Sequence, residues 1–231
     1  MSNDPLAIGY LILSLTVAGI SGWILYRNVE GRSKGVAVTA FMGWVFFAGM
    51  LGYTGILACK TPPGPVFVGV PALLIVFFGI VRNPNSAAFA ARVALPVLTG
   101  FQAYRVFVEL GFHELANRKM VPQLMTFRGL NFDILIGVSA PVVALVAWKK
   151  PNLKPLYRGW NIIGLLSVIN AIMIGVLSFL GRTHGVPGGD VPNTAIGIFP
   201  FSFVPGLLAP LAIVLHVLSL KALSVKEIQK Q

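Results

Sequence analysis

Residues 6–26 read LAIGYLILSLTVAGISGWILY, a run without a single charged side chain. An α-helix rises about 1.5 Å per residue, so a run of this length covers the roughly 30 Å hydrocarbon core of a bilayer. Transmembrane strands instead alternate apolar and polar residues over about ten positions, and this run does not alternate. Because lipid offers no hydrogen-bond partner to backbone amides, the stretch predicts a membrane-spanning α-helix.

Similar apolar runs recur along the chain, separated by turns rich in Pro, Gly, Asn and basic residues. The chain is 56% hydrophobic and only 11% charged, whereas an average soluble domain is about a quarter charged. We therefore predict an all-α integral membrane protein, a bundle of about seven transmembrane helices that forms a single domain over residues 1–231. The predicted spans are 6–26, 36–57, 65–82, 88–112, 130–148, 157–180 and 195–220.

The distribution of Lys and Arg predicts how these spans are oriented. With seven spans, successive loops alternate between the two sides of the membrane, and cytoplasmic loops hold the excess of Lys and Arg. The N-terminal side carries only Lys60, Arg118, Lys119, Arg128 and Arg182. The side of the C-terminus carries Arg27, Arg32, Lys34, Arg82, Arg92, Lys149, Lys150, Lys154, Arg158, Lys221, Lys226 and Lys230. The C-terminus is therefore predicted to be cytoplasmic and the N-terminus outside.

The net charge of +11 would suggest nucleic-acid binding in a soluble protein. Here the basic residues fall between apolar spans, where they set topology and contact anionic lipid headgroups. We expect the lipid bilayer and not nucleic acid as the partner of this charge. The predicted location is a cell membrane of the bacterial inner-membrane type, with the protein as a homo-oligomer or in a complex with another membrane protein.

The predicted fourth span carries a stripe of polar residues. At 100° per residue, Thr99, Gln102, Arg105, Glu109 and His113 fall within an arc of about 120° on one helix face. Arg105 and Glu109 stand one turn apart, near enough to form an ion pair. Ionised side chains at such depth are costly unless they face protein or water, so both are predicted to face the helix bundle.

Other polar residues fall in the same outer half of the predicted bundle. Asn131 and Asp133 open the fifth span, and Asn170 lies near the middle of the sixth. In the seventh span, Pro200, Pro205 and Pro210 predict a kinked or locally unwound helix. His216 lies further along that span and is predicted to be a packing residue far from the outer cluster. The predicted ligand site, a pocket open to the outer face, consists of Arg105, Glu109, His113, Asn131, Asp133 and Asn170.

This pattern favours binding or translocation of a small solute or ion that enters from the outer side. Arg105 would hold a polar or anionic group, and Glu109 with Asp133 would exchange protons, which would couple transport to the proton. The sequence identifies no cofactor and no set of metal ligands.

Three other functions are compatible with the sequence. A membrane-embedded metal-dependent hydrolase could use Glu109, His113, Asp133 and His184, whose side chains bind zinc or transfer protons. A b-type haem could be held by His113 and His184. A non-catalytic subunit of a membrane complex needs no chemistry of its own.

The topology is testable with reporter fusions. A fluorescent protein fused to the C-terminus should fluoresce, and alkaline phosphatase fused there should be inactive, because the former folds in the cytoplasm and the latter outside it. The reverse pattern would contradict the predicted orientation.

Overall fold

The computed structural model describes residues 4–31, 33–58 and 64–228, and every regular element in these residues is helical. The predicted all-α class is therefore confirmed. The α-helices are α1 (Pro5–Asn28), α2 (Ser33–Tyr53), α3 (Val66–Val76), α4 (Asn85–Arg92), α5 (Leu95–Phe101), α6 (Tyr104–Asn117), α7 (Asp133–Lys149), α8 (Lys154–Phe179) and α9 (Ala209–Ile228). Short 3₁₀ turns form η1 (Ile56–Ala58) and η3 (Gln123–Met125), and π-helical turns form η2 (Phe77–Val81) and η4 (Val204–Leu208).

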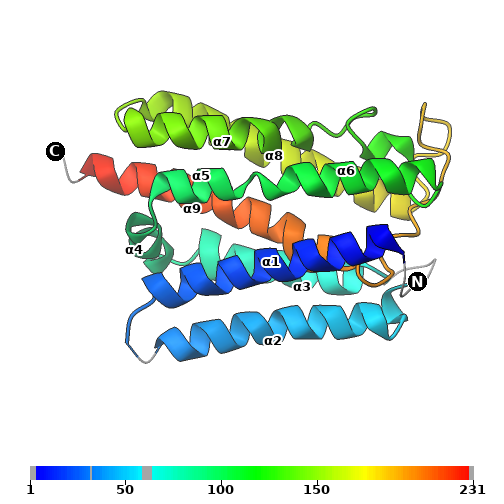
Figure 1. The fold of residues 1–231 in the computed structure, drawn as a ribbon, viewed down its shortest axis with the longest axis horizontal. Helices are drawn as coiled ribbons and strands as arrows, with labels where there is room; N and C mark the ends of the chain where they lie inside the picture. The colour runs from blue at the N-terminus through cyan, green and yellow to red at the C-terminus, as the bar shows by residue number, and fades with distance from the viewer. Residues whose placement is uncertain (1–3, 32, 59–63, 229–231) are drawn as a thin grey trace.

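Most helices run along the long axis of the molecule, with the two ends of the chain at opposite ends (Figure 1). Helices α5 and α6 lie end to end, and the short α4 is bent by 84° from the helix that precedes it. Helix α9 is central, because it packs on α3, α4, α5 and α8. The remaining helices surround it, with α1 packed on α2 and α6.

In the described part of the chain, four helical segments are long and apolar enough to cross a membrane, and the bent pair Val66–Val81 with Asn85–Arg92 would make a fifth. The four are Pro5–Asn28, Ser33–Tyr53, Lys154–Phe179 and Val204–Val225. Helix α7, with 17 residues, is at the lower limit for a span, and α5 and α6, with 7 and 14, are each shorter than one.

The predicted fourth span, 88–112, is wrong as one continuous helix. Helix α4 ends at Arg92, Val93 and Ala94 are extended, and α5 begins with Pro96 in its first turn. Proline has no N–H to donate to the carbonyl four residues earlier, which weakens a helix at this point, and the extended Val93 and Ala94 end it. A second break follows Phe101, where Gln102 and Ala103 make tight i→i−3 hydrogen bonds. The polar stripe therefore spans two helices, α5 and α6.

The predicted irregularity of the last span is confirmed. Residues 199–202 form turns, η4 is π-helical, and regular helix begins only at Ala209. Pro210 cannot donate to the carbonyl of Gly206, which instead accepts a 2.7 Å hydrogen bond from the indole N–H of Trp44. A neighbouring helix thus satisfies the carbonyl that proline leaves free, as an apolar environment requires.

The distribution of burial is the reverse of that in a soluble protein. Large apolar side chains point outward from most long helices, among them Phe46 at 71% exposed and Trp148 at 78%. Arg105 and Glu109 are each only 2% exposed. The expectation that these two charges face the bundle is confirmed. Soluble proteins rarely expose so much contiguous apolar surface, so the outer face fits lipid as its solvent.

Some sequence-based expectations fall outside the described residues. These are the basic residues Arg32, Lys60 and Lys230 used for the orientation, and most of the predicted turn that follows the second span.

The contact between α1 and α6 depends on a glycine. The phenol of Tyr10 donates to the carbonyl of Val108 at 2.8 Å, and a methyl group on Gly111 would overlap the Tyr10 ring. Gly111→Ala should therefore destabilise the protein by about 1–3 kcal/mol, as overpacking does elsewhere. Gly9→Ala on α1 is the control, because its Cβ meets nothing within 4 Å. Thermal unfolding in detergent measures both, and equal melting temperatures would contradict this packing.

Candidate functional site

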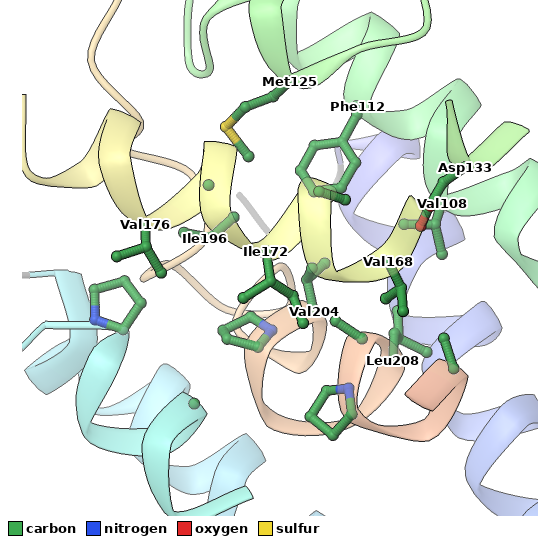
Figure 2. A pocket seen from close by; sticks show the side chains of 18 of the residues that line it. Val108, Phe112, Met125, Asp133, Val168, Ile172, Val176, Ile196, Val204 and Leu208 are labelled. Atoms are coloured by element: carbon green, nitrogen blue, oxygen red, sulfur yellow. The ribbon is translucent and has the colours of Figure 1, made fainter. Parts of the chain in front are cut away.

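A cavity of about 210 Å³ lies between α3, α6, α8 and the η4–α9 segment. Its walls are mostly apolar: Figure 2 shows Phe112, Ile172 and Leu208 around it, with a carboxylate oxygen of Asp133 at one edge. The polar side chains in its lining come from α6, α7 and the turn before α7. They are Tyr104, Arg105, Glu109, Asn131 and Asp133.

Arg105 ties three helices together beside this cavity. Its Nη2 forms an ion pair with Oδ1 of Asp133, the first residue of α7. Its Nη1 donates to Nε2 of His216 on α9 at 2.9 Å. Among the described residues no ion pair joins Arg105 to Glu109, so the pairing that their spacing allows is not formed. The guanidinium reaches across to neighbouring helices instead of along its own.

Asp133 is held in place by two further contacts. Its backbone N–H donates to Oδ1 of Asn131 at 3.1 Å, which satisfies one of the free amides at the start of α7. Its carboxylate accepts a 2.5 Å hydrogen bond from Ser167 of α8. The carboxylate therefore connects α6, α7 and α8.

Glu109 is only partly satisfied. Oε1 accepts a 2.7 Å hydrogen bond from Asn131, whose amide also donates to the carbonyl of Met125 at 3.0 Å. Within the described ranges, Oε2 is buried and has no hydrogen-bond partner, and the same is true of Nε of Arg105. Buried polar atoms without partners are uncommon in proteins, which makes Oε2 of Glu109 a candidate acceptor.

The sequence analysis missed His216 as part of this cluster. Its Nδ1 lies 3.0 Å from Oδ1 of Asn161 on α8, and its Nε2 faces Arg105. Gly164 makes room for the imidazole, because a Cβ there would overlap the ring. The signal in the sequence was the close spacing of Asn161 and Gly164 on one face of the sixth span, which gives a polar partner and space beside it.

Two predicted site residues lie elsewhere. His113 is half-buried and packs its ring against Phe127 at 5.0 Å between ring centroids, outside the cavity lining. Asn170 donates to the carbonyl of Leu130 at 2.7 Å and does not line the cavity either. The cavity thus brings together Arg105, Glu109, Asn131 and Asp133, but not His113 or Asn170.

His184, which the hydrolase and haem hypotheses need, lies in the exposed loop after α8. It is bonded there to Asp190 at 3.0 Å. Hydrogen bonds from the Gly185 N–H and from His184 lower the pKa of Asp190. Within the described ranges, no three His, Cys, Asp or Glu side chains are grouped closely enough to hold a metal ion. The geometry therefore does not favour either hypothesis.

Fold and site together define an all-helical protein with several membrane-type helices and a buried charge network beside an apolar cavity. The chain belongs to the family described as Domain of unknown function (DUF8737), which matches residues 62–224. This range includes α3 to α8, the cavity lining and His216. No curated protein and no solved structure matches the chain.

The ion pair between Arg105 and Asp133 can be tested by paired substitutions. Asp133→Leu should destabilise the protein by about 3–5 kcal/mol, because it leaves a buried guanidinium without its counter-charge. Arg105→Met combined with Asp133→Leu should be milder than the sum of the two single changes. Arg118→Gln, which breaks only the exposed pairs with Asp4 and Glu114, is the control and should have little effect. Additive losses in thermal unfolding would show that Arg105 and Asp133 do not interact.

Proposed function

We propose that this protein crosses the membrane about seven times and uses the cavity to bind a small amphiphile whose polar head donates a hydrogen bond to Glu109. In this proposal the N-terminus is outside and the C-terminus cytoplasmic. The observation that carries the proposal is the buried Oε2 of Glu109, which has no partner among the described residues and belongs to a residue lining a mostly apolar cavity.

The number of spans has support from the arrangement of the shorter helices. Helix α6 runs alongside α1, and α7 runs beside α8 (Figure 1). Helix α5 packs on both α7 and α9, so the two shorter segments belong to the same bundle as the long ones. In a bilayer these segments would cross with them.

The position of the cavity fits entry from the outer side. Its lining includes Pro65 and Val66 at the start of α3, Asp133 at the start of α7, and Phe179 at the end of α8. All of these lie toward the end of the molecule that holds the N-terminus (Figure 1). With the N-terminus outside, the cavity occupies the outer half of the bundle.

The charges around the cavity favour a donor head over an anionic one. Both terminal nitrogens of Arg105 already have partners, Asp133 and His216. The lining holds one guanidinium and two carboxylates, so an added anion would meet an excess of carboxylate groups. Glu109 instead offers a free acceptor, which suits a hydroxyl or an ammonium group. This replaces the expectation that Arg105 would hold an anionic group.

The lining favours an apolar body for the same ligand. The other residues of the lining are mostly apolar, and α3, α8 and α9 contribute aliphatic side chains to it. Binding pockets for small molecules commonly combine such walls with a few polar groups that fix orientation. A short alkyl chain or terpenoid with one donor head matches this combination.

The proposal is tested by photo-crosslinking in lipid nanodiscs. A diazirine-bearing dodecanol serves as the probe, with dodecylamine, 1-dodecanol and dodecanoic acid as competitors at equal membrane concentration. We expect labelled peptides from α3, α6 and α8, and competition by the amine and the alcohol but not by the acid. Glu109→Leu should reduce labelling about tenfold, as expected for loss of a hydrogen bond to a charged group.

Two matched variants complete this experiment. Glu114→Gln changes an exposed carboxylate on the same helix and should leave labelling unchanged. Gly69→Leu should abolish labelling, because Gly69 lines the cavity and its Cβ has only ordinary contact with Pro205, at 3.5 Å. Stronger competition by dodecanoic acid would mean that Arg105 is the binding group. Equal competition by the amine, the alcohol and the acid, with labelling unaffected by Glu109→Leu, would mean that the cavity does not select a polar headgroup. Either result would overturn the proposal.

A further inference from the structure

A second cavity, of about 220 Å³, lies on the other side of the irregular last span. Its walls come from α1, α2, α3, η2, α4, α5 and the η4–α9 segment, and it shares only Pro210 with the first cavity. The polar side chains Trp44 and Ser21 in its lining already make hydrogen bonds. Trp44 donates to the carbonyl of Gly206, and Ser21 donates to the carbonyl of Val17 at 2.8 Å. The interior therefore suits hydrocarbon and offers nothing to a polar head.

One end of this cavity lies next to a cluster of cations. The lining residues Ile80, Phe89 and Leu218 are each followed within three residues by a basic residue, namely Arg82, Arg92 and Lys221. The ammonium of Lys221 donates to the carbonyls of Ile80 at 2.8 Å and Val81 at 3.0 Å, and to the hydroxyl of Ser86 at 2.7 Å. These bonds join the end of η2, the start of α4 and the last helix into one rim.

The other two cations of the rim, Arg92 and Arg82, differ in whether their side chains have partners. Arg92 donates to the carbonyl of Asn28 at 3.2 Å and lies 3.4 Å from the exposed carboxylate of Glu30. The guanidinium of Arg82 is exposed and makes no hydrogen bond or ion pair within the described part of the chain. The rim thus has an excess of positive charge and one guanidinium with all its donors available.

From this combination we infer that the second cavity holds one acyl chain of an anionic phospholipid, with the lipid phosphate bound at Arg82 beside Arg92 and Lys221. The apolar cavity would hold the acyl chain of the lipid, and the cationic rim would bind its phosphate headgroup. Arginine binds phosphate through two parallel N–H donors, and the excess positive charge of the rim favours a headgroup with a net negative charge. The rim lies at the end of the bundle that holds the C-terminus, where the inner leaflet of a membrane carries anionic lipid.

This inference does not depend on the ligand proposed for the first cavity. The two cavities lie on different faces of the η4–α9 segment and are lined by different residues except for Pro210. Variants of Glu109 or Gly69 should therefore leave lipid retention unchanged.

Native mass spectrometry of the detergent-purified protein tests the lipid site. The protein is mixed with dioleoyl phosphatidylglycerol or with dioleoyl phosphatidylcholine, and the fraction that retains one lipid is measured. Phosphatidylglycerol should be retained in preference, and Arg82→Gln should weaken its retention about fivefold, the effect of one surface cation on anionic lipid. Arg128→Gln, at the opposite end of the bundle, is the matched control for charge and should have no effect.

A second variant tests the chain-binding part independently of charge. Gly79 lines the cavity, and its Cβ meets nothing within 4 Å, so the first atom of the side chain that Gly79→Leu adds has space there. It should reduce retention while leaving the melting temperature of the lipid-free protein unchanged. Equal retention of the two lipids, or equal losses in Arg82→Gln and Arg128→Gln, would overturn the inference. Unchanged retention in Gly79→Leu would overturn the assignment of the cavity to the acyl chain.

Discussion

The buried guanidinium of Arg105 is the constraint around which the inner part of this protein is organised. It is 2% exposed inside a bundle whose outer face is apolar, so its charge must be compensated from within the protein. Asp133 supplies the counter-charge and His216 the second partner. Asn131, Ser167 and Asn161 then hold these two partners. The relative positions of α6, α7, α8 and α9 all depend on this one cation.

The proline-rich last span provides the space beside this network. Its residues 199–208 form turns and a π-helical segment in place of regular α-helix, and both cavities lie against that segment. Freed carbonyls are satisfied from neighbouring helices, as Trp44 does for Gly206. An irregular backbone at membrane depth is tolerated where protein surrounds it, and such segments often line binding sites. The same irregularity thus separates a cavity with a polar wall from one that is wholly apolar inside.

The sequence predicted those features that depend on local composition. Continuous apolar runs gave the positions of α1, α2, α7 and α8 to within a few residues, because helix length and hydropathy are properties of the segment itself. The burial of Arg105 and Glu109 followed from the cost of placing charge in lipid. The seven-span topology and its orientation stay predictions.

The features that depend on packing between helices could not be predicted. The polar stripe on 88–112 assumed one regular helix, and the break at Gln102 and Ala103 changes the direction of its residues. His216 was predicted to lie far from the outer cluster because the last span was taken to begin at residue 195, whereas regular helix begins at Ala209. The sequence offered only Glu109, one turn along the same helix, as a partner for Arg105. The structure provides Asp133 of α7 and His216 of α9, which only the packing of the helices brings close.

The most direct test of this account is an experimental structure determined in lipid nanodiscs that resolves the cavity between α3, α6, α8 and α9. The account predicts that Arg105 lies between Asp133 and His216. It also predicts elongated density in the cavity, with one end at hydrogen-bond distance from Oε2 of Glu109, about 2.6–3.2 Å. A guanidinium turned away from Asp133, or a cavity closed by its own apolar side chains with Glu109 sealed off, would contradict it.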